Sequence, residues 1–339
     1  MDRLPVIAVT GHLGTGKTTV ANHLLSRPGA RLGVVVNDFG EINVDAALVT
    51  GQIDEAAAIS GGCLCCLPDS GGLDDALERL AHPRLRLDAV LVEASGVADP
   101  IALVRLIRYS GVDRIRPGGV IEVVDAVHHA TTIDVFPEPP ARYRAATLVA
   151  VTKSDLIDPV GRTSALDRIR ERVSRVNPAA HVVVAPHGRL DPALVFDVAA
   201  EEEPGDELPL ARLLREERRD HADHEHARSA EVLTSGPVSP TALLDLLEDP
   251  PEGAYRIKGR VAIRGPRGVR GYVVNLVGRL AHVARLADPP TPSGELVAIG
   301  LHLDADAARA RLEAVVTEAA SRPDAAGLRR LHRYRRLSD

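Results

Sequence analysis

The sequence predicts an α/β fold, in which a parallel sheet has helices on both faces and a small α+β domain follows it. Through roughly the first 200 residues, apolar runs rich in Val, Ile and Leu alternate with amphipathic stretches, which is typical of parallel sheets. The alternation stops at a highly charged segment, and shorter strand-like runs follow. The strands expected in the first domain are 4–10, 31–37, 87–93, 119–124, 147–152 and 181–185, and the helices are 17–26, 74–81, 100–109 and 164–176.

The charged segment 201–230 is poor in residues that favour strands, so we predict a linker there. Ser239-Pro240 then gives a typical helix start, with Ser as the N-cap and Pro at the first helical position. Short strand-like runs and one more helical stretch complete a small sheet domain. Its expected strands are 255–264, 269–277, 279–286 and 295–300, and its closing helix is 304–321.

Length and composition fit a two-domain protein. The 339 residues suffice for two cores, predicted at 1–200 and 231–321, and we expect the Arg-rich tail 322–339 to be solvated. The net charge of -6 argues against a nucleic-acid partner. No apolar run approaches the ~18 residues of a membrane span, and the short run near the start leads directly into a glycine-rich loop. We therefore expect a cytoplasmic protein with no membrane partner.

That glycine-rich loop, residues 11–18 with the sequence GHLGTGKT, fits the phosphate-loop pattern G-x-x-x-x-G-K-[ST]. It follows an apolar strand and opens a helix, which is the context the motif requires, and it predicts a P-loop NTPase fold. Lys17 is expected to reach the β- and γ-phosphates, and the Thr18 hydroxyl to ligate Mg²⁺. The nucleotide-binding residues expected here are Gly11, Gly14, Thr15, Gly16, Lys17, Thr18 and Thr19.

A second motif favours guanine over adenine. Thr152-Lys153-Ser154-Asp155, after a later strand, resembles the N-K-x-D motif of GTPases, with Thr in place of Asn. The carboxylate of Asp155 can accept from both N1–H and the exocyclic amine of guanine, whereas adenine would leave it unpaired. Lys153 is one of only three lysines among 41 basic residues, and we expect its stem to lie across the base. A plain surface turn is the alternative.

Acidic residues after two other strands are candidates for contact with the γ-phosphate. Glu93 ends the strand 87–93 and is expected to hold Mg²⁺, and Gly96 offers a backbone N–H close by. The segment 37–45 is predicted as an acidic switch loop, in which Asp38 is our candidate for orienting the attacking water. Lys17, Asp38 and Glu93 are thus the expected catalytic residues. An ordinary turn is the alternative for Asp38.

The three cysteines of the chain, Cys63, Cys65 and Cys66, lie within four residues of one another. Clustered thiolates favour zinc and similar metals, and a disulfide would be strained over so short a loop. A tetrahedral ion needs a fourth ligand, for which we name Glu41. A cargo site that opens and a purely structural zinc site are both compatible with this cluster. His221, His224 and His226 form a further cluster, which either shuttles metal loosely or belongs to a solvated linker.

Taken together, these motifs resemble the CobW-type metallochaperone GTPases, which are relatives of the nickel-insertion GTPases for urease and hydrogenase. The resemblance is carried by GHLGTGKTT, NDFGEINVD, GGCLCC, EASGVADP and TKSD, and in the second domain by YRIKGRVAI and ELVAIGLHLD. It implies GTP, Mg²⁺ and a cargo of Zn²⁺ or Co²⁺ on Cys63, Cys65 and Cys66. It also implies slow GTP hydrolysis, delivery of metal to a client metalloenzyme, and a nucleotide- or metal-dependent homodimer.

Three other functions compete with this interpretation. One is a dedicated inserter of cobalt or iron into a single enzyme, of the cobalamin-pathway or nitrile-hydratase type. Another is an ATP-dependent small-molecule kinase, which would leave TKSD and the C-x-C-C cluster unexplained. The third is a non-catalytic metal sensor, whose metal binding would not depend on nucleotide.

Overall fold

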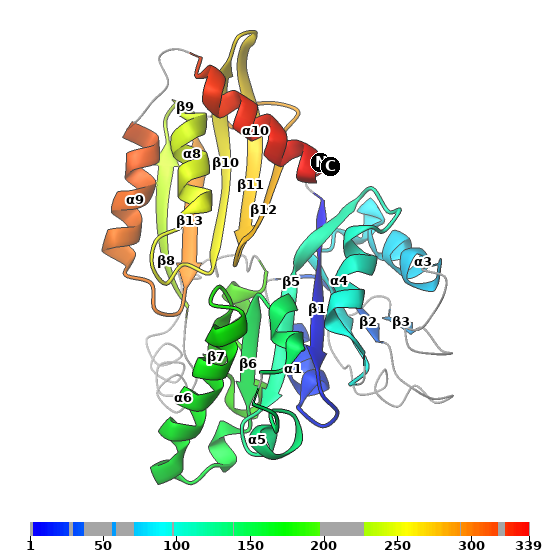
Figure 1. Cartoon of the computed structure of the whole chain (residues 1–339). Helices are drawn as coiled ribbons and strands as arrows, with labels where there is room; N and C mark the ends of the chain where they lie inside the picture. Colours follow the sequence, from blue (N-terminus) through cyan, green and yellow to red (C-terminus); the bar gives the residue numbers. More distant parts are fainter. Residues whose placement is uncertain are drawn as a thin grey trace, which may run out of the picture.

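The computed structural model describes residues 3–26, 30–36, 56–58, 71–96, 98–137, 139–196, 227–291, 293–317 and 323–338. Its first domain is a parallel sheet of seven strands in the order β3-β2-β4-β1-β5-β6-β7 (Figure 1). Because all these strands run in one direction, their carboxyl ends meet at one edge of the sheet. The strands are β1 (Leu4–Gly11), β2 (Leu32–Val36), β3 (Ala56–Ala58), β4 (Ala89–Glu93), β5 (Ile115–Asp125), β6 (Leu148–Thr152) and β7 (His181–Val184).

Helices cover both faces of this sheet, as the sequence predicts. Successive residues of β1 point to opposite faces, so that Ile7 and Val9 pack in one apolar layer and Val6 and Ala8 in the other. The first layer contains α1, the second contains α3 and α4, and α6 packs on β6. The helices are α1 (Lys17–Leu25), α3 (Gly71–Leu80), α4 (Pro100–Arg108), α5 (His129–Thr132) and α6 (Pro159–Val176), with short 3₁₀ turns η2 (Pro83–Leu85), η3 (Ala141–Ala145), η4 (Ser154–Leu156), η5 (Pro186–Gly188) and η6 (Pro192–Leu194).

Three helices begin in the same way, with a polar N-cap followed by proline. The side chains of Asp99, Asp158 and Ser239 accept a hydrogen bond from the backbone N–H groups of Ile101, Val160 and Ala242, at the starts of α4, α6 and α8. Such caps satisfy backbone donors that the first helical turn leaves without partners, and proline at the first position has no donor to satisfy. The start predicted at Ser239 is therefore confirmed.

The second domain is an antiparallel sheet with helices on one face (Figure 1). Ile257 and Val261 of β10 lie in the core beneath these helices, so the alternate residues Arg256, Lys258 and Arg260 point to the other face. The strand order is β12-β11-β10-β13-β8, and β9 pairs with β10. The elements are β8 (Arg228–Thr234), β9 (Pro237–Val238), α8 (Pro240–Glu248), β10 (Arg256–Gly265), β11 (Gly268–Val277), β12 (Leu280–Arg285), β13 (Gly294–Gly300), α9 (Ala305–Thr317) and α10 (Ala325–Ser338).

Helix α10 corrects one expectation drawn from the sequence, a solvated tail at 322–339. Leu328, Leu331 and Tyr334 recur every three residues and form an apolar stripe in the core of the second domain. The intervening arginines conceal this stripe when hydrophobicity is averaged along the chain. The predicted linker is also too long, since residues 228–230 already belong to β8.

The two domains pack against each other through Tyr255, which precedes β10. Its hydroxyl lies 3.0 Å from Thr147 Oγ1, and its ring meets that of His181 edge-on at a centroid distance of 5.0 Å. Tyr255 and Val277 belong to the same apolar cluster as α1 and β1. In the part of the chain that the structure describes, no helix is long and apolar enough to cross a membrane.

Candidate functional site

The phosphate loop connects the end of β1 to the start of α1. Gly11, Gly14 and Gly16 have φ angles of 151°, 75° and 91°, a region that glycine enters readily and other residues rarely. A Cβ atom at Gly11 would lie 2.6 Å from the carbonyl oxygen of Val123 in β5. The predicted glycines therefore have a conformational reason and, at Gly11, a steric one. Thr19, on α1, packs against Gly188 in the loop after β7.

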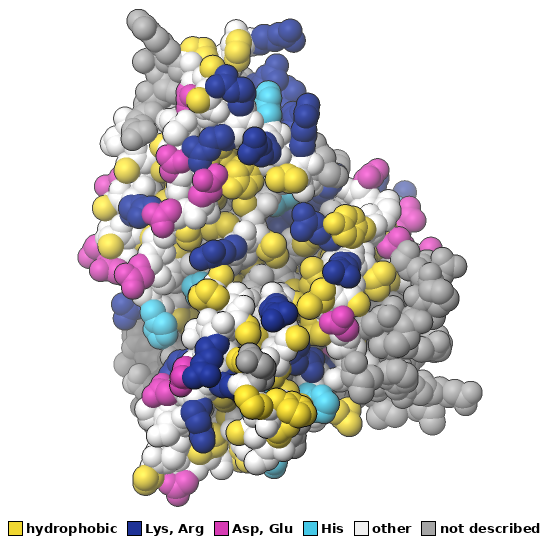
Figure 2. Space-filling model, in the orientation of Figure 1, with side chains coloured by type: hydrophobic (Ala, Val, Ile, Leu, Met, Phe, Trp, Pro, Cys, Tyr) yellow, Lys and Arg dark blue, Asp and Glu magenta, His cyan; other side chains and the backbone are white. Residues whose placement is uncertain are grey.

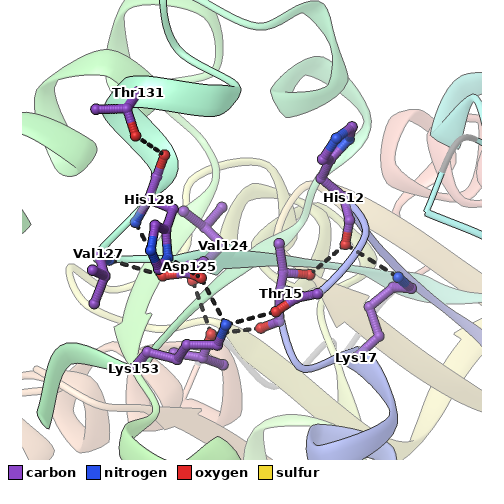
Figure 3. A network of polar contacts seen from close by, with 11 residues as sticks. His12, Thr15, Lys17, Val124, Asp125, Val127, His128, Thr131 and Lys153 are labelled. Atoms are coloured by element: carbon purple, nitrogen blue, oxygen red, sulfur yellow. Dashed lines mark hydrogen bonds and ion pairs between the residues drawn. The ribbon is translucent and has the colours of Figure 1, made fainter. Parts of the chain in front are cut away.

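Lys17 is only 8% exposed, at the first position of α1. Its Nζ donates a hydrogen bond of 3.2 Å to the carbonyl oxygen of His12 (Figure 3). The same carbonyl accepts a 2.9 Å hydrogen bond from Thr15 Oγ1. The ammonium group thus lies across the concave side of its own loop, where a phosphate oxygen could replace the carbonyl.

Thr18 and Glu93 come together at the carboxyl edge of the sheet. The Thr18 hydroxyl donates a 2.7 Å hydrogen bond to Glu93 Oε1, and the Glu93 side chain is almost wholly buried. A hydroxyl and a carboxylate oxygen at this distance form a donor set that suits Mg²⁺, which prefers oxygen ligands and binds through one or two of them in nucleotide sites. The two magnesium residues expected from the sequence are therefore neighbours.

Gly96 lies against the phosphate loop. A Cβ atom at this position would come within 2.6 Å of the Leu13 backbone nitrogen and 2.8 Å of its Cα atom. Any side chain would therefore push the loop after β4 away from the phosphate loop. This close approach explains the glycine independently of the γ-phosphate contact expected for it.

The TKSD motif, whose Thr152 is the last residue of β6, binds directly to the phosphate loop. The Thr152 hydroxyl donates to the carbonyl oxygen of Thr15 at 2.6 Å and lies 3.1 Å from the carbonyl oxygen of Val124. Lys153 has a φ angle of 57°, and its Nζ donates 2.7 Å hydrogen bonds to the Gly14 carbonyl and to Asp125 Oδ2 (Figure 3). Thr152 in place of Asn therefore keeps the link to the loop.

Asp125, the last residue of β5, links Lys153 to His128. It accepts hydrogen bonds from Lys153 Nζ, from the backbone N–H groups of Val127 and His128, and from His128 Nδ1 at 3.1 Å. Burial alone would raise the pKa of Asp125, but these hydrogen bonds outweigh it and lower that pKa to about 2. A pocket of about 390 Å³ lies between this carboxylate, Lys153 and residues 12–15 of the phosphate loop.

Asp155, the predicted guanine reader, faces the loop after β7. Its Oδ1 accepts a 3.4 Å hydrogen bond from the backbone N–H of His187, and its Oδ2 lies 3.4 Å from His187 Nδ1. His187 has a φ angle of 53°. The structure therefore brings the carboxyl ends of β1, β4, β5, β6 and β7 together around one site.

Comparison with known proteins identifies the family. The model of the CobW/HypB/UreG nucleotide-binding domain matches residues 5–184, and that of the cobalamin synthesis protein cobW C-terminal domain matches residues 227–316. The chain belongs to the CobW/HypB/UreG family. Both halves of the resemblance noted in the sequence are thereby confirmed.

Several relatives of this CobW/HypB/UreG protein are zinc chaperones by name. Zinc chaperone CobW of Pseudomonas aeruginosa is 31% identical over an alignment of 350 positions, which covers 90% of this chain and 89% of that protein. Zinc chaperone YjiA of Escherichia coli is 31% identical over 204 residues, which cover 58% of this chain and 62% of that protein. The crystal structure of Zn(II)-bound YjiA GTPase from E. coli has 23% sequence identity and a TM-score of 0.43, covering 93% of this chain and 99% of that one.

Five of the residues expected from the sequence lie outside the described part of this CobW/HypB/UreG chain. They are Asp38, Glu41, Cys63, Cys65 and Cys66. The histidines of the linker, His221, His224 and His226, lie outside it as well. Among the residues that are described, no group of three or more His, Cys, Asp or Glu side chains is placed to hold a metal ion.

The structure also adds residues that the sequence analysis missed. Asp125 and His187 both follow predicted strands at the carboxyl edge, a position that could have singled them out. Glu122 could not be foreseen, because it lies within β5, where it accepts a 2.6 Å hydrogen bond from Thr10 and pairs with Arg142. Burial raises the pKa of Glu122, although Arg142 and Thr10 oppose the rise.

Proposed function

We propose that this P-loop GTPase is a metallochaperone, which binds zinc or cobalt and uses GTP hydrolysis to deliver the metal to a client protein. The names of its relatives support a metallochaperone, since zinc chaperones and a zinc-regulated GTPase metalloprotein activator are among them. Within this proposal, Cys63, Cys65 and Cys66 bind the cargo and Glu41 is the fourth ligand. Zinc is the first choice because thiolates in close sequence favour it.

The nucleotide half of the proposal rests on the described residues. Lys17 neutralises the β- and γ-phosphates, and Asp155 accepts hydrogen bonds from guanine while the stem of Lys153 lies along the base. Thr18 and Glu93 would hold Mg²⁺, which neutralises charge on the phosphate oxygens when bound. Asp38 is proposed to orient the water that attacks the γ-phosphorus. The proton of that water leaves with the inorganic phosphate.

One observation carries the coupling between the two halves: the hydrogen bond between Thr18 and Glu93. It ties the first turn of α1 to the end of β4, the strand that pairs with β2. In sequence, β2 ends two residues before Asp38 and β3 ends five residues before Cys63. The carboxyl ends of these parallel neighbours share one edge with the phosphate loop. A change at the γ-phosphate therefore has a short route, through one side-chain hydrogen bond and the pairing of neighbouring strands, toward the chain that follows β2 and β3.

The proposed cycle needs the metal affinity to differ between the GTP-bound and GDP-bound states. Coupling between two ligands is typically worth about 1–3 kcal/mol, or roughly 5- to 150-fold in affinity. The test titrates zinc and cobalt into reduced protein that is loaded with GDP or with a non-hydrolysable GTP analogue, using a chromophoric chelator as competitor. Since the chain has only three cysteines, the Cys63→Ser, Cys65→Ser, Cys66→Ser variant removes every thiol and serves as the control.

Stoichiometric binding that needs the cysteines and differs between the nucleotides is the expected result. A second variant, Glu93→Gln, keeps the cysteines and should reduce the difference between the nucleotides without abolishing metal binding. Tight metal binding with the same affinity in both nucleotide states would indicate a structural ion or a metal sensor. That result would contradict metal delivery driven by GTP. Binding that survives loss of all three thiols would contradict the assigned ligands.

A further inference from the structure

An arginine-rich pocket lies at the opposite end of the parallel sheet from the phosphate loop. It has a volume of about 500 Å³ and is formed by both domains. The first domain contributes the start of β1, the end of α3, and the loops that lead into β4 and β5, and the second domain contributes Arg256 and Asn275. Figure 2 shows Lys and Arg side chains gathered over α10 and around the junction of the domains. The site is therefore separate from the nucleotide site.

The charge of this pocket is strongly positive. Five arginines line it and only two aspartates, Asp88 and Asp113. Two of the arginines are deeply buried, Arg116 at 7% and Arg256 at 5% exposure, and each comes from a different domain. Arg256 Nη1 donates a 3.2 Å hydrogen bond to the carbonyl oxygen of Ala193. The excess of guanidinium groups over carboxylates leaves the lining with a net positive charge, which favours an anion. The other three arginines are Arg3, Arg86 and Arg114.

Asn275 supplies a second, independent observation. It is 6% exposed and lines the pocket, yet its Nδ2 has no hydrogen-bond partner among the described residues. A buried amide donor without a partner destabilises the fold, and an acceptor oxygen of a ligand would remove that cost. The amide therefore complements the guanidinium groups, which are donors only.

His282 is the neighbour of Asn275 in the sheet, since the two residues pair across β11 and β12. It is 8% exposed, and its Nε2 also has no hydrogen-bond partner within the described part of the chain. Burial, and then the positive charges of Arg116 and Arg3, lower the pKa of His282 to about 3. The imidazole is therefore neutral at neutral pH, and the positive field of the arginines is consistent with that state.

We propose that this pocket binds a small organic oxyanion, a phosphate or carboxylate compound, between Arg116 of the first domain and Arg256 and Asn275 of the second. Guanidinium groups bind both kinds of oxyanion with paired hydrogen bonds. Leu4, Leu80 and Phe196 form an apolar part of the wall, which accommodates the carbon part of the ligand. A ligand held by both domains stabilises their packing, so it raises the melting temperature of the whole chain.

The test uses full-length protein saturated with GDP and Mg²⁺, so that the phosphate loop is occupied. Pyrophosphate and citrate are titrated separately by calorimetry at constant ionic strength, and melting temperatures are measured alongside. We expect one saturable site for at least one probe. Binding of pyrophosphate alone assigns a phosphate ligand, and binding of citrate alone assigns a carboxylate. Failure of both probes to bind would overturn the proposal.

Variants locate the site. Asn275→Leu keeps the volume and removes the amide, and should weaken the bound probe at least tenfold with GDP affinity unchanged. Arg114→Gln lies on the exposed rim, where it cannot disturb the core, and should weaken binding several-fold. Arg309→Gln is the matched control, an exposed arginine on α9 outside the pocket, and should change nothing. Equal binding by wild type, Asn275→Leu and Arg114→Gln would place the probe elsewhere and refute the assignment.

Discussion

The hydroxyl of Thr152 donates a hydrogen bond to the carbonyl oxygen of Thr15, and so connects the guanine motif to the phosphate loop at 2.6 Å. The same hydroxyl lies 3.1 Å from the Val124 carbonyl oxygen. A hydroxyl has one hydrogen, whereas the asparagine of the N-K-x-D pattern has two amide N–H donors. Thr152 therefore has one donor where the asparagine of the pattern has two. It uses that donor for the shorter contact, the one with Thr15.

Replacing Thr152 by Val keeps the shape and removes the donor. The Thr15 carbonyl then loses a buried partner, so the free energy of unfolding should fall by roughly 1–3 kcal/mol. GDP affinity should fall with it, because the phosphate loop loses its tie to TKSD. Urea unfolding and a fluorescent-GDP assay measure the two effects. Thr152→Ser, which retains the hydroxyl, should stay close to wild type, and equal losses in both variants would contradict the role of the hydrogen bond.

If Asp155 binds guanine as proposed, Asp155→Asn should weaken GDP binding by roughly 10- to 100-fold, since it removes a charged acceptor from the guanine N–H groups. The new amide can donate to a carbonyl, which xanthine has at the position of the guanine amine. Competition between GDP and xanthosine diphosphate measures the change in preference. His187→Ala removes the ring 3.4 Å from Asp155 and retains the carboxylate, so it should keep the preference for guanine. Unchanged selectivity in Asp155→Asn would contradict the assignment.

Asp125→Asn should reveal a pH-dependent part of the stability. The pKa of Asp125 is lowered from 3.8 to about 2 in the folded protein, so its contribution is complete above pH 4 and is lost as the pH falls toward 2. The shift corresponds to about 2 kcal/mol. The difference in unfolding free energy between wild type and variant, without nucleotide, should be constant from pH 8 to about 5 and should shrink below about 4. A difference that stays constant down to pH 3 would contradict this pairing.

Tyr255→Phe tests the contact between the domains. Tyr255 is 3% exposed, and the loss of its hydrogen bond with Thr147 should cost about 1 kcal/mol. Burial raises the pKa of Tyr255 to about 12, so the hydroxyl should resist ionisation up to that pH. Unfolding curves measure the cost, and absorbance near pH 11 measures the ionisation. Tyr109→Phe is the control for the unfolding curves, because that ring is 78% exposed and should contribute little to stability.

Local motifs predicted the fold, and they placed several of the described candidate residues beside strand ends. Gly11, Lys17, Thr18 and Glu93 are of this kind, and parallel pairing brings them together. What the sequence did not predict depends on contacts between distant segments. Glu122 is paired with Arg142 only once η3 packs beside β5, and nothing near Glu122 in sequence indicates it.

The three-residue strand β3 and the helix α10 were missed for a different reason. β3 is too short to show a period, and the spacing of Leu328 and Leu331 in α10 is hidden among arginines. The sheet that each of them packs on or extends makes their roles clear: α10 lies on the second-domain sheet, and β3 pairs with β2. The sequence pattern shows which side chains a segment could bury, but only the tertiary structure shows which of them are buried.

The central position of β1 has a consequence for the dynamics of the chain. It is hydrogen-bonded to β4 on one side and to β5 on the other. Backbone amides in such a strand exchange with deuterated water only when the whole sheet opens, so β1 should be among the slowest segments to exchange. One end of this strand begins the arginine-rich pocket and the other begins the phosphate loop. The exchange rate of the β1 amides is therefore an internal reference, with which the faster exchange of amides at either end of the strand can be compared.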